Sequence, residues 1–238
     1  MAEIAIAFDV ATLEQAIELD QRLGEGPELA KIGLELFTAA GPDAVRALNE
    51  RGRRVFLDLK LHDIPHTVHG AAAAAARLGA DLLTVHAMGG SAMIAAAVEG
   101  VRHAEGRTRI VAVTLLTSLD AYNLPPGFQS PLHPGVVVAQ QLAMAERAGA
   151  AGIVCSGSDL AGVRMMRRGK PFFAVTPGIR PAGMGRGDQE RVTTVAEAVE
   201  QGSSVLVLGR AVTSALDPRE ALEAARHECA EATAARQA

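Results

Sequence analysis

Short apolar runs alternate with longer amphipathic segments along this chain, and that rhythm restricts the fold more than any other feature. The apolar runs occupy residues 4–8, 29–33, 54–59, 82–86, 110–116, 152–156, 172–176 and 205–209. Segments with helical periodicity occupy residues 12–23, 41–51, 66–78, 90–103, 136–148, 158–168, 194–201 and 218–235. A strand and a helix repeating about every 30 residues indicate βα units with a parallel sheet.

The number of these units points to an architecture. Eight units without an obvious linker favour a closed α/β fold, the (β/α)8 TIM barrel, over an open doubly wound sheet, which is the alternative. The chain has 238 residues, 49% of them hydrophobic, which is enough for a large core. We therefore expect a single catalytic barrel domain over residues 1–238.

Composition excludes several classes of partner. The net charge is -4 and no basic run stands out, so nucleic acid is not an expected partner. No apolar run reaches the roughly 18 residues that a membrane span needs. Met1 leads almost directly into a strand without a signal peptide, and Cys155 and Cys229 are too few for a disulfide framework. We expect a cytoplasmic protein.

Charged residues collect where the predicted strands end. The run VFLDLKLHDIPHTV carries Asp58, Lys60 and Asp63, although it is built like a buried strand. Asp58 and Lys60 are two residues apart, so they project from the same face of a strand. Asp9 and Lys31 end neighbouring strands, and TIM barrels place their chemistry at these ends. A structural ion pair is the alternative, but the alternating charges favour an active site.

Histidines near this run raise the question of a metal. His62, His66 and His69 lie close in sequence, but Pro65 disrupts helical spacing and no second cluster completes a ligand set. We therefore expect no metal. His86 at a strand end is expected to be packed or hydrogen-bonded rather than a base.

The last predicted strand suggests a phosphate site. In VLVLGRAVTSA a strand is followed by Gly209, Arg210 and a helix start. Helix N-termini attract phosphate, and barrels often hold it after strands seven and eight. Arg180 in the neighbouring loop supplies a second positive charge. The alternative is an Arg210 that only packs at the surface. The pattern indicates a phosphorylated small molecule and proton or carbanion chemistry.

One family shares these motifs. FLDLKLHDIPHTV resembles the Asp-x-Lys-x-x-Asp-Ile-Pro-x-Thr signature of the orotidine 5'-monophosphate decarboxylase family. The similarity continues in order through AIAFDV, AKIGLELF, TVHAMGG, VTLLTS, TPGIRP, GDQERV and LVLGRAVT. Sugar-phosphate decarboxylases and aldolase-type synthases share the Asp-x-Lys-x-x-Asp part, so the Ile-Pro-x-Thr extension is the narrower signal. One departure is His66, where bacterial members usually carry Asn.

The resemblance implies roles around the pyrimidine. Lys60 would protonate C6 as carbon dioxide leaves, and Asp58 would lie near the substrate carboxylate. Lys31 would pair with Asp58 and touch the ribose, whose hydroxyls Asp9 would bind. Thr117 would meet the pyrimidine edge.

It also implies a phosphate site and a dimer. The phosphate would be held by Arg180, Gln189, Gly209 and Arg210, with the loop of Gln189 closing as a lid. Asp63 and Thr67 would reach the site of a neighbouring chain, so that a homodimer is required.

The implied reaction turns orotidine 5'-monophosphate into uridine 5'-monophosphate and CO2 without a cofactor, as the last step of de novo pyrimidine biosynthesis. Two other classes stay open. The first is another reaction on this scaffold, either a metal-assisted keto-sugar phosphate decarboxylase or a Schiff-base aldolase using Lys60 or Lys31. The second is a pyrimidine-nucleotide binder without catalysis.

Overall fold

A closed ring of parallel strands forms the centre of the molecule. The structure is a computed structural model that describes residues 2–117, 133–180 and 193–237. Within these residues the ring contains β1 (Glu3–Ala7), β2 (Leu29–Ile32), β3 (Arg54–Leu61), β4 (Ala80–His86), β5 (Arg109–Val113), β6 (Gly152–Val154), β7 (Phe173–Arg180) and β9 (Val205–Leu208). The parallel pairing of β1 with β9 closes it, and β8 (Thr193–Thr194) adds a short pairing to β7. The predicted (β/α)8 barrel is confirmed.

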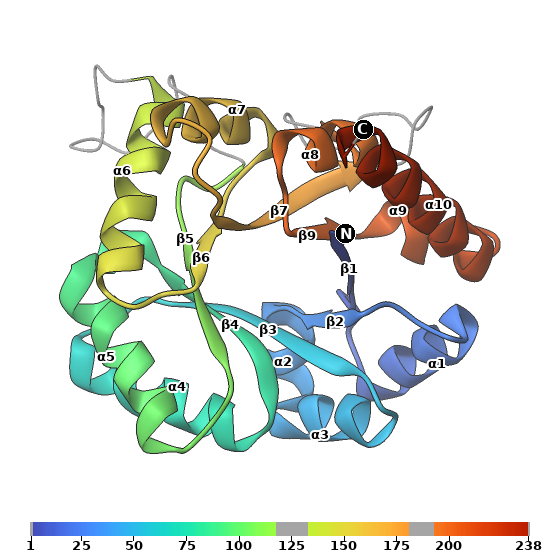
Figure 1. Cartoon of the computed structure of the whole chain (residues 1–238). Coiled ribbons are helices and arrows are strands. Elements are labelled where there is room, and N and C mark those ends of the chain that lie inside the picture. The colour runs from blue at the N-terminus through green and yellow to red at the C-terminus, as the bar shows by residue number, and fades with distance from the viewer. Residues whose placement is uncertain (1, 118–132, 181–192, 238) are drawn as a thin grey trace.

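Helices cover the outside of this ring (Figure 1). They are α1 (Leu13–Leu23), α2 (Leu34–Ala40), α3 (Pro42–Glu50), α4 (Pro65–Arg77), η1 (Ala87–Gly89), α5 (Gly90–His103), α6 (Pro134–Arg147), α7 (Gly157–Met166), α8 (Val195–Gln201), α9 (Arg210–Thr213) and α10 (Pro218–Gln237). Proline in the first turn starts α3, α4 and α6, where its missing N–H costs nothing. Over the described residues, no helix combines the length and apolarity that crossing a membrane requires.

Alternation along the strands separates two hydrophobic layers. On β1, Ile4 and Ile6 pack in the layer beneath the helices, whereas Ala5 and Ala7 face the inside of the ring. The inner layer also includes Leu29, Phe56, Leu82, Val111, Val175, Val205 and Val207. Because side chains alternate with a period of two, each strand contributes to both layers.

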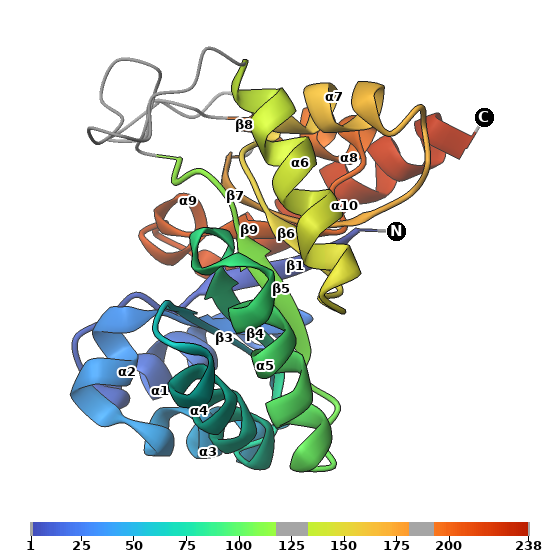
Figure 2. The same cartoon turned by 90° about the vertical axis from the view of Figure 1, so that its left-hand side faces the viewer.

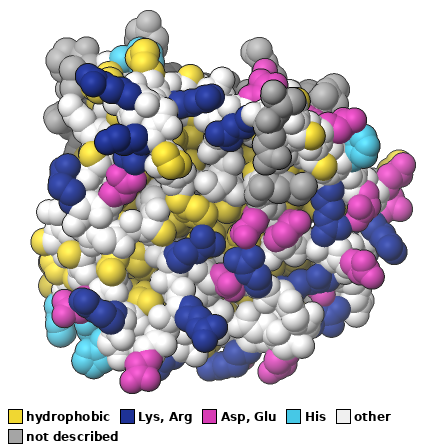
Figure 3. Space-filling model, viewed as in Figure 1, with side chains coloured by type: hydrophobic (Ala, Val, Ile, Leu, Met, Phe, Trp, Pro, Cys, Tyr) yellow, Lys and Arg dark blue, Asp and Glu magenta, His cyan; other side chains and the backbone are white. Residues whose placement is uncertain are grey.

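The ring has two chemically different ends. In Figure 2 both chain ends lie on the right, where β1 starts, whereas α2 and α9 lie on the left. Figure 3 looks at the end where the strands start, with hydrophobic side chains in the middle and charged ones around them. There Arg54 pairs with Glu3 at 3.2 Å and with Asp81 at 3.0 Å, which ties together the starts of three strands.

Two local features differ from the sequence-based prediction. Residues 34–40 form α2, which was not expected, and Gly41 at φ +57° separates it from α3. The expected strand ended at residue 176 and Arg180 was expected in a loop, but residues 177–180 continue β7. Gly178 has φ +77° and lies where the register between β7 and β9 shifts. A bulge therefore carries the strand through a Thr-Pro-Gly sequence that resembles a turn.

His86 ends β4 and is hydrogen-bonded, as expected. Its Nδ1 accepts the N–H of Met88 at 3.3 Å, and its ring stacks on that of His62 with centroids 5.3 Å apart. Burial lowers the pKa of His86 below its usual value, and the positive charges of His62 and Lys60 lower it further. The folded state therefore favours the neutral imidazole.

This burial predicts an acid-sensitive contribution to stability. The unfolded chain takes up a proton at residue 86 below pH 6.5, whereas the folded chain does so only at a lower pH. The free energy of unfolding should therefore fall as the pH drops from about 7 to 5, and His86→Asn should make that fall shallower. Urea unfolding across this range measures it. His227→Asn, at an exposed position, is the control, and equal slopes for His86→Asn and the unmodified protein would contradict the prediction.

Candidate active site

A polar layer covers the inner hydrophobic layer at the ends of the strands. Along five strands, an inward-facing apolar residue is followed two positions later by a polar residue or glycine. The pairs are Ala7 and Asp9, Leu29 and Lys31, Phe56 and Asp58, Leu82 and Thr84, and Val207 and Gly209. Since a period of two keeps the side chains on one face, the barrel directs this polar set inward at its carboxyl end.

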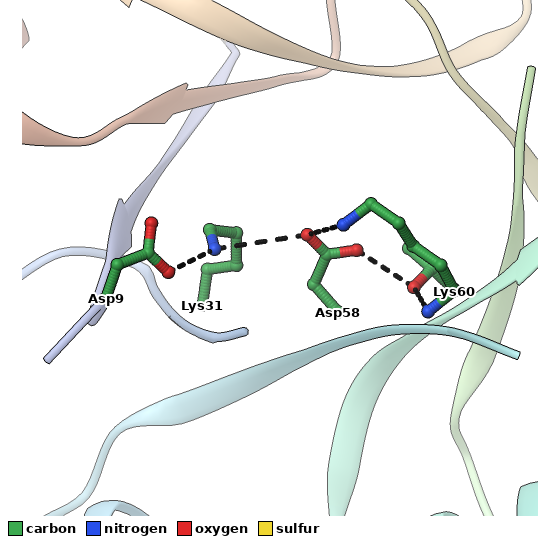
Figure 4. A network of polar contacts seen from close by, with 5 residues as sticks. Asp9, Lys31, Asp58 and Lys60 are labelled. Carbon is green, nitrogen blue, oxygen red and sulfur yellow. Dashed lines mark hydrogen bonds and ion pairs between the residues drawn. The ribbon is translucent and has the colours of Figure 1, made fainter. Parts of the chain in front are cut away.

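The three charged residues of this set form one continuous chain of charges with Lys60 (Figure 4). Lys31 Nζ lies 2.9 Å from Asp9 Oδ1 and 3.9 Å from Asp58 Oδ2. Lys60 Nζ lies 2.8 Å from the same oxygen of Asp58. The structure thus brings together Asp9, Lys31, Asp58 and Lys60 with alternating sign.

Exposure differs along this chain of charges. The side chains of Lys31 and Asp58 are only 10% and 13% exposed, whereas those of Asp9 and Lys60 are 55% and 34% exposed. A buried charge is tolerated only with partners, and loss of one partner typically costs about 3–5 kcal/mol. Asp58 and Lys31 therefore depend on their partners to remain charged, whereas the side chain of Lys60 stays partly exposed.

Gly33 makes room for this arrangement. A Cβ at this position would lie 2.8 Å from Asp9 Oδ1 and 3.2 Å from Lys31 Nζ. Any side chain there would press on the ion pair, so the glycine that starts α2 is part of the site's geometry.

The backbone at Lys60 does not follow the regular strand geometry that the sequence predicts. The alternation argument places both side chains on one face of a regular strand, but Lys60 has φ +49°, in the left-handed region. The register between β3 and β4 shifts between Leu57 and Leu61. The side chain of Lys60 therefore projects from an irregular, bulged segment of β3.

Thr84 contacts both residues and was missed by the sequence analysis. Its hydroxyl accepts the backbone N–H of Lys60 at 2.7 Å and donates to Asp58 Oδ1 at 2.9 Å. The only sequence signal was a hydroxyl residue within the apolar run LLTVH.

Asp9 also lines a pocket at this end of the barrel. The pocket has a volume of about 320 Å³. Asp9, Arg180, Gly209 and Arg210 line it together with Glu35, which the sequence analysis did not select. The two predicted phosphate arginines thus share one pocket, although they come from β7 and α9.

Other predicted residues lie apart from the chain of charges. Asp63 and Thr67 are exposed just beyond β3, and Asp63 Oδ1 accepts the N–H of Ile64 at 2.6 Å. Within the described part of the chain, Asp63 forms no ion pair with Lys60. Thr117 is half-buried after β5, on the same rim, and Gln189 lies outside the described residues.

The histidines near β3 are separated from one another. His62 stacks on His86, while His69 meets the edge of His103 with centroids 5.7 Å apart. Among residues 2–117, 133–180 and 193–237, no three His, Cys, Asp or Glu side chains are grouped to hold a metal ion.

Comparisons with known proteins agree with this geometry. The model of the orotidine 5'-phosphate decarboxylase / HUMPS family matches residues 2–225. Two proteins named orotidine 5'-phosphate decarboxylase are similar. The Moorella thermoacetica protein is 48% identical over 223 residues, covering 91% of this chain and 87% of its own length. The Anaeromyxobacter sp. (strain K) protein is 50% identical over 222 residues, covering 93% and 95%.

Solved structures show the same relationship. A crystal structure of orotidine 5'-phosphate decarboxylase from Lactobacillus acidophilus matches with a TM-score of 0.83 and 36% identity. The match covers 96% of this chain and 99% of that one. This chain belongs to the orotidine 5'-phosphate decarboxylase / HUMPS family.

Proposed function

We propose that this protein converts orotidine 5'-monophosphate into uridine 5'-monophosphate and CO2, the last step of de novo pyrimidine biosynthesis, in the cytoplasm. The observation that carries the proposal is the chain of charges from Asp9 through Lys31 and Asp58 to Lys60 at the carboxyl end of the barrel. The similar proteins named orotidine 5'-phosphate decarboxylase support the same substrate.

The reaction explains why ammonium groups are needed. The bond between C6 and the carboxylate breaks, CO2 leaves, and the electron pair stays on C6. With no cofactor to delocalise that pair, the protein itself must supply a preorganised positive charge and a proton. Lys60 would donate a proton from Nζ to C6 and regain one from solvent. Asp58 would lie beside the departing carboxylate and hold the ammonium in place.

The geometry favours Lys60 over the other lysines as the proton donor. The chain has three lysines, at positions 31, 60 and 170. Lys31 is enclosed between two carboxylates, and Lys170 is exposed after α7, just before β7 starts at the opposite end of the barrel. Only Lys60 combines a carboxylate partner at 2.8 Å with a side chain that is still 34% exposed. Lys31 would bind the ribose instead.

The pocket beside Asp9 would hold the rest of the nucleotide. Arg180 and Arg210 supply positive charge, and the backbone at Gly209 adds polar contacts at the start of α9. Asp9 lies between this pocket and Lys31, so its carboxylate can accept ribose hydroxyls. Gln189 and Thr117 would complete the phosphate and pyrimidine contacts, as the family resemblance implies.

A second copy of the chain would complete the site. Asp63 and Thr67 fit such a copy, because both are exposed just after β3, the strand that carries Lys60. Exposed apolar side chains follow three adjacent strands on the same rim: Leu34 (55% exposed), Ile64 (66%) and Met88 (41%). Exposed apolar clusters mark protein interfaces, so we propose a homodimer with Asp63 of each copy near Lys60 of the other.

An ultraviolet assay with orotidine monophosphate tests the function and its proton donor together. Lys60→Ala should lower turnover at least ~10³-fold, about 4 kcal/mol of barrier, because both the proton and the stabilising charge are lost. Lys170→Ala, which removes an exposed lysine at the other end of the barrel, should leave turnover unchanged.

Two treatments of the unmodified protein separate the alternatives. A chelator should not lower turnover, whereas a metal-assisted decarboxylase would lose activity. Borohydride with substrate should trap nothing, whereas a Schiff-base enzyme would be inactivated. Near-normal turnover in Lys60→Ala would rule out this lysine as the proton donor.

Arg210→Ala tests the phosphate site. Loss of a charge-assisted contact should raise KM about 30-fold, or about 2 kcal/mol, with a smaller change in kcat. Arg46→Ala on α3, whose side chain is 57% exposed, is the matched control and should leave KM unchanged. An unchanged KM in Arg210→Ala would count against the assignment.

A mixing experiment tests whether the site is shared between copies. Lys60→Ala and Asp63→Asn should each be nearly inactive, but a mixed dimer has one site with Lys60 from one copy and Asp63 from the other. Random reassociation should therefore restore about a quarter of the normal activity, since half of the dimers are mixed and each has one intact site. No recovery on mixing, with dimer exchange verified, would place Asp63 in the site of its own chain.

A further inference from the structure

The backbone at Lys60 adopts a conformation that its side chain disfavours. With φ +49°, this residue lies in the left-handed region, which is rare for residues that carry a Cβ. A neighbouring group must hold it there, because a strained residue persists only where its surroundings specify it.

The strand pairing shows where that group lies. Leu57 pairs with Leu83, and the next pair joins Leu61 to Val85. Three residues of β3, positions 58–60, therefore stand opposite the single residue Thr84 of β4. A bulge of this kind redirects side chains away from the regular ladder.

The single hydroxyl of Thr84 forms hydrogen bonds with two residues of the bulge. Its oxygen accepts the backbone N–H of Lys60 at 2.7 Å and its hydrogen goes to Asp58 Oδ1 at 2.9 Å. Thr84 is fully buried, so no water replaces either bond without rearrangement. Because Thr84 binds Oδ1 of Asp58, the other oxygen, Oδ2, faces the two lysines. Lys60 Nζ lies 2.8 Å from it and Lys31 Nζ lies 3.9 Å from it.

We infer that Thr84 is a positioning residue, which sets both the backbone of Lys60 and the orientation of the Asp58 carboxylate for decarboxylation. This inference rests on the proposed function. A hydroxyl is needed because the group must accept from an N–H and donate to a carboxylate at once. Serine can do both, whereas valine keeps the shape of threonine and can do neither.

The test compares three variants in the decarboxylation assay. Thr84→Val should lower kcat about 100-fold with a KM change of less than about 3-fold, because the reacting groups move while the binding pocket stays. Thr84→Ser should keep kcat within about 5-fold of normal. Thr108→Val is the matched control, since Thr108 is buried and donates to the carbonyl of Ala80 at the start of β4, far from the site.

A double variant separates positioning from general damage to the fold. If Thr84 acts through Lys60, then Thr84→Val should add no further loss to the residual turnover of Lys60→Ala. A damaged fold would lower that residual turnover as well. The inference is overturned if Thr84→Val keeps normal kcat, if Thr84→Ser loses as much as Thr84→Val, or if the two losses multiply.

A crystal structure of Thr84→Val distinguishes this inference from the proposed function. Lys60 should leave the left-handed region, and its ammonium should move away from Asp58. An unchanged backbone at Lys60 would overturn the positioning role whether or not the protein turns over orotidine monophosphate. Absence of turnover in the unmodified protein would instead contradict the proposed function alone.

Discussion

The carboxylate of Asp58 is the contact point on which the site depends. It is almost buried, and each of its oxygens has its own partners: Thr84 on Oδ1, and the ammonium groups of Lys60 and Lys31 on Oδ2. A buried carboxylate is costly unless such partners satisfy it, and the partners in turn need the carboxylate. Asp9 balances Lys31 from the far side. The four charges sum to zero, so the barrel can enclose two lysines at one end of its core.

The two ends of the barrel use ion pairs for different purposes. Where the strands start, Arg54 bridges Glu3 and Asp81 with side chains that are 33–43% exposed, and it joins three strands around the ring. Such pairs contribute little because water screens them. Where the strands end, the side chains of Lys31 and Asp58 are only 10% and 13% exposed, so water screens the interaction between them less and its geometry matters more. The fold can therefore tolerate changes at the first end, while the second end is constrained by chemistry.

The fold and most of the charged chain were predictable, because both follow from simple periodicities. Alternating apolar runs and helices specify the barrel, and a period of two places Asp58 above the inner core. The left-handed backbone of Lys60 was not predictable, since no glycine or proline marks the bulge. Thr84 was missed because its partners are 24 and 26 residues away along the chain. The roles proposed for Asp63 and Thr67 involve a second chain, so neither the periodicity of this sequence nor the geometry of one chain could predict them.

Asp9 joins the two halves of the proposed substrate site. It lines the pocket that contains Arg180 and Arg210, and it also pairs with Lys31 at the start of the charged chain. A nucleotide phosphate held by the arginines would place the ribose at Asp9 and the base toward Lys60. Binding energy gained far from C6 would then fix the reacting carbon against the ammonium. Lys31 and Asp58 lie on the adjacent strands β2 and β3, and Asp9 follows the end of β1 by two residues, so the barrel itself sets most of that alignment.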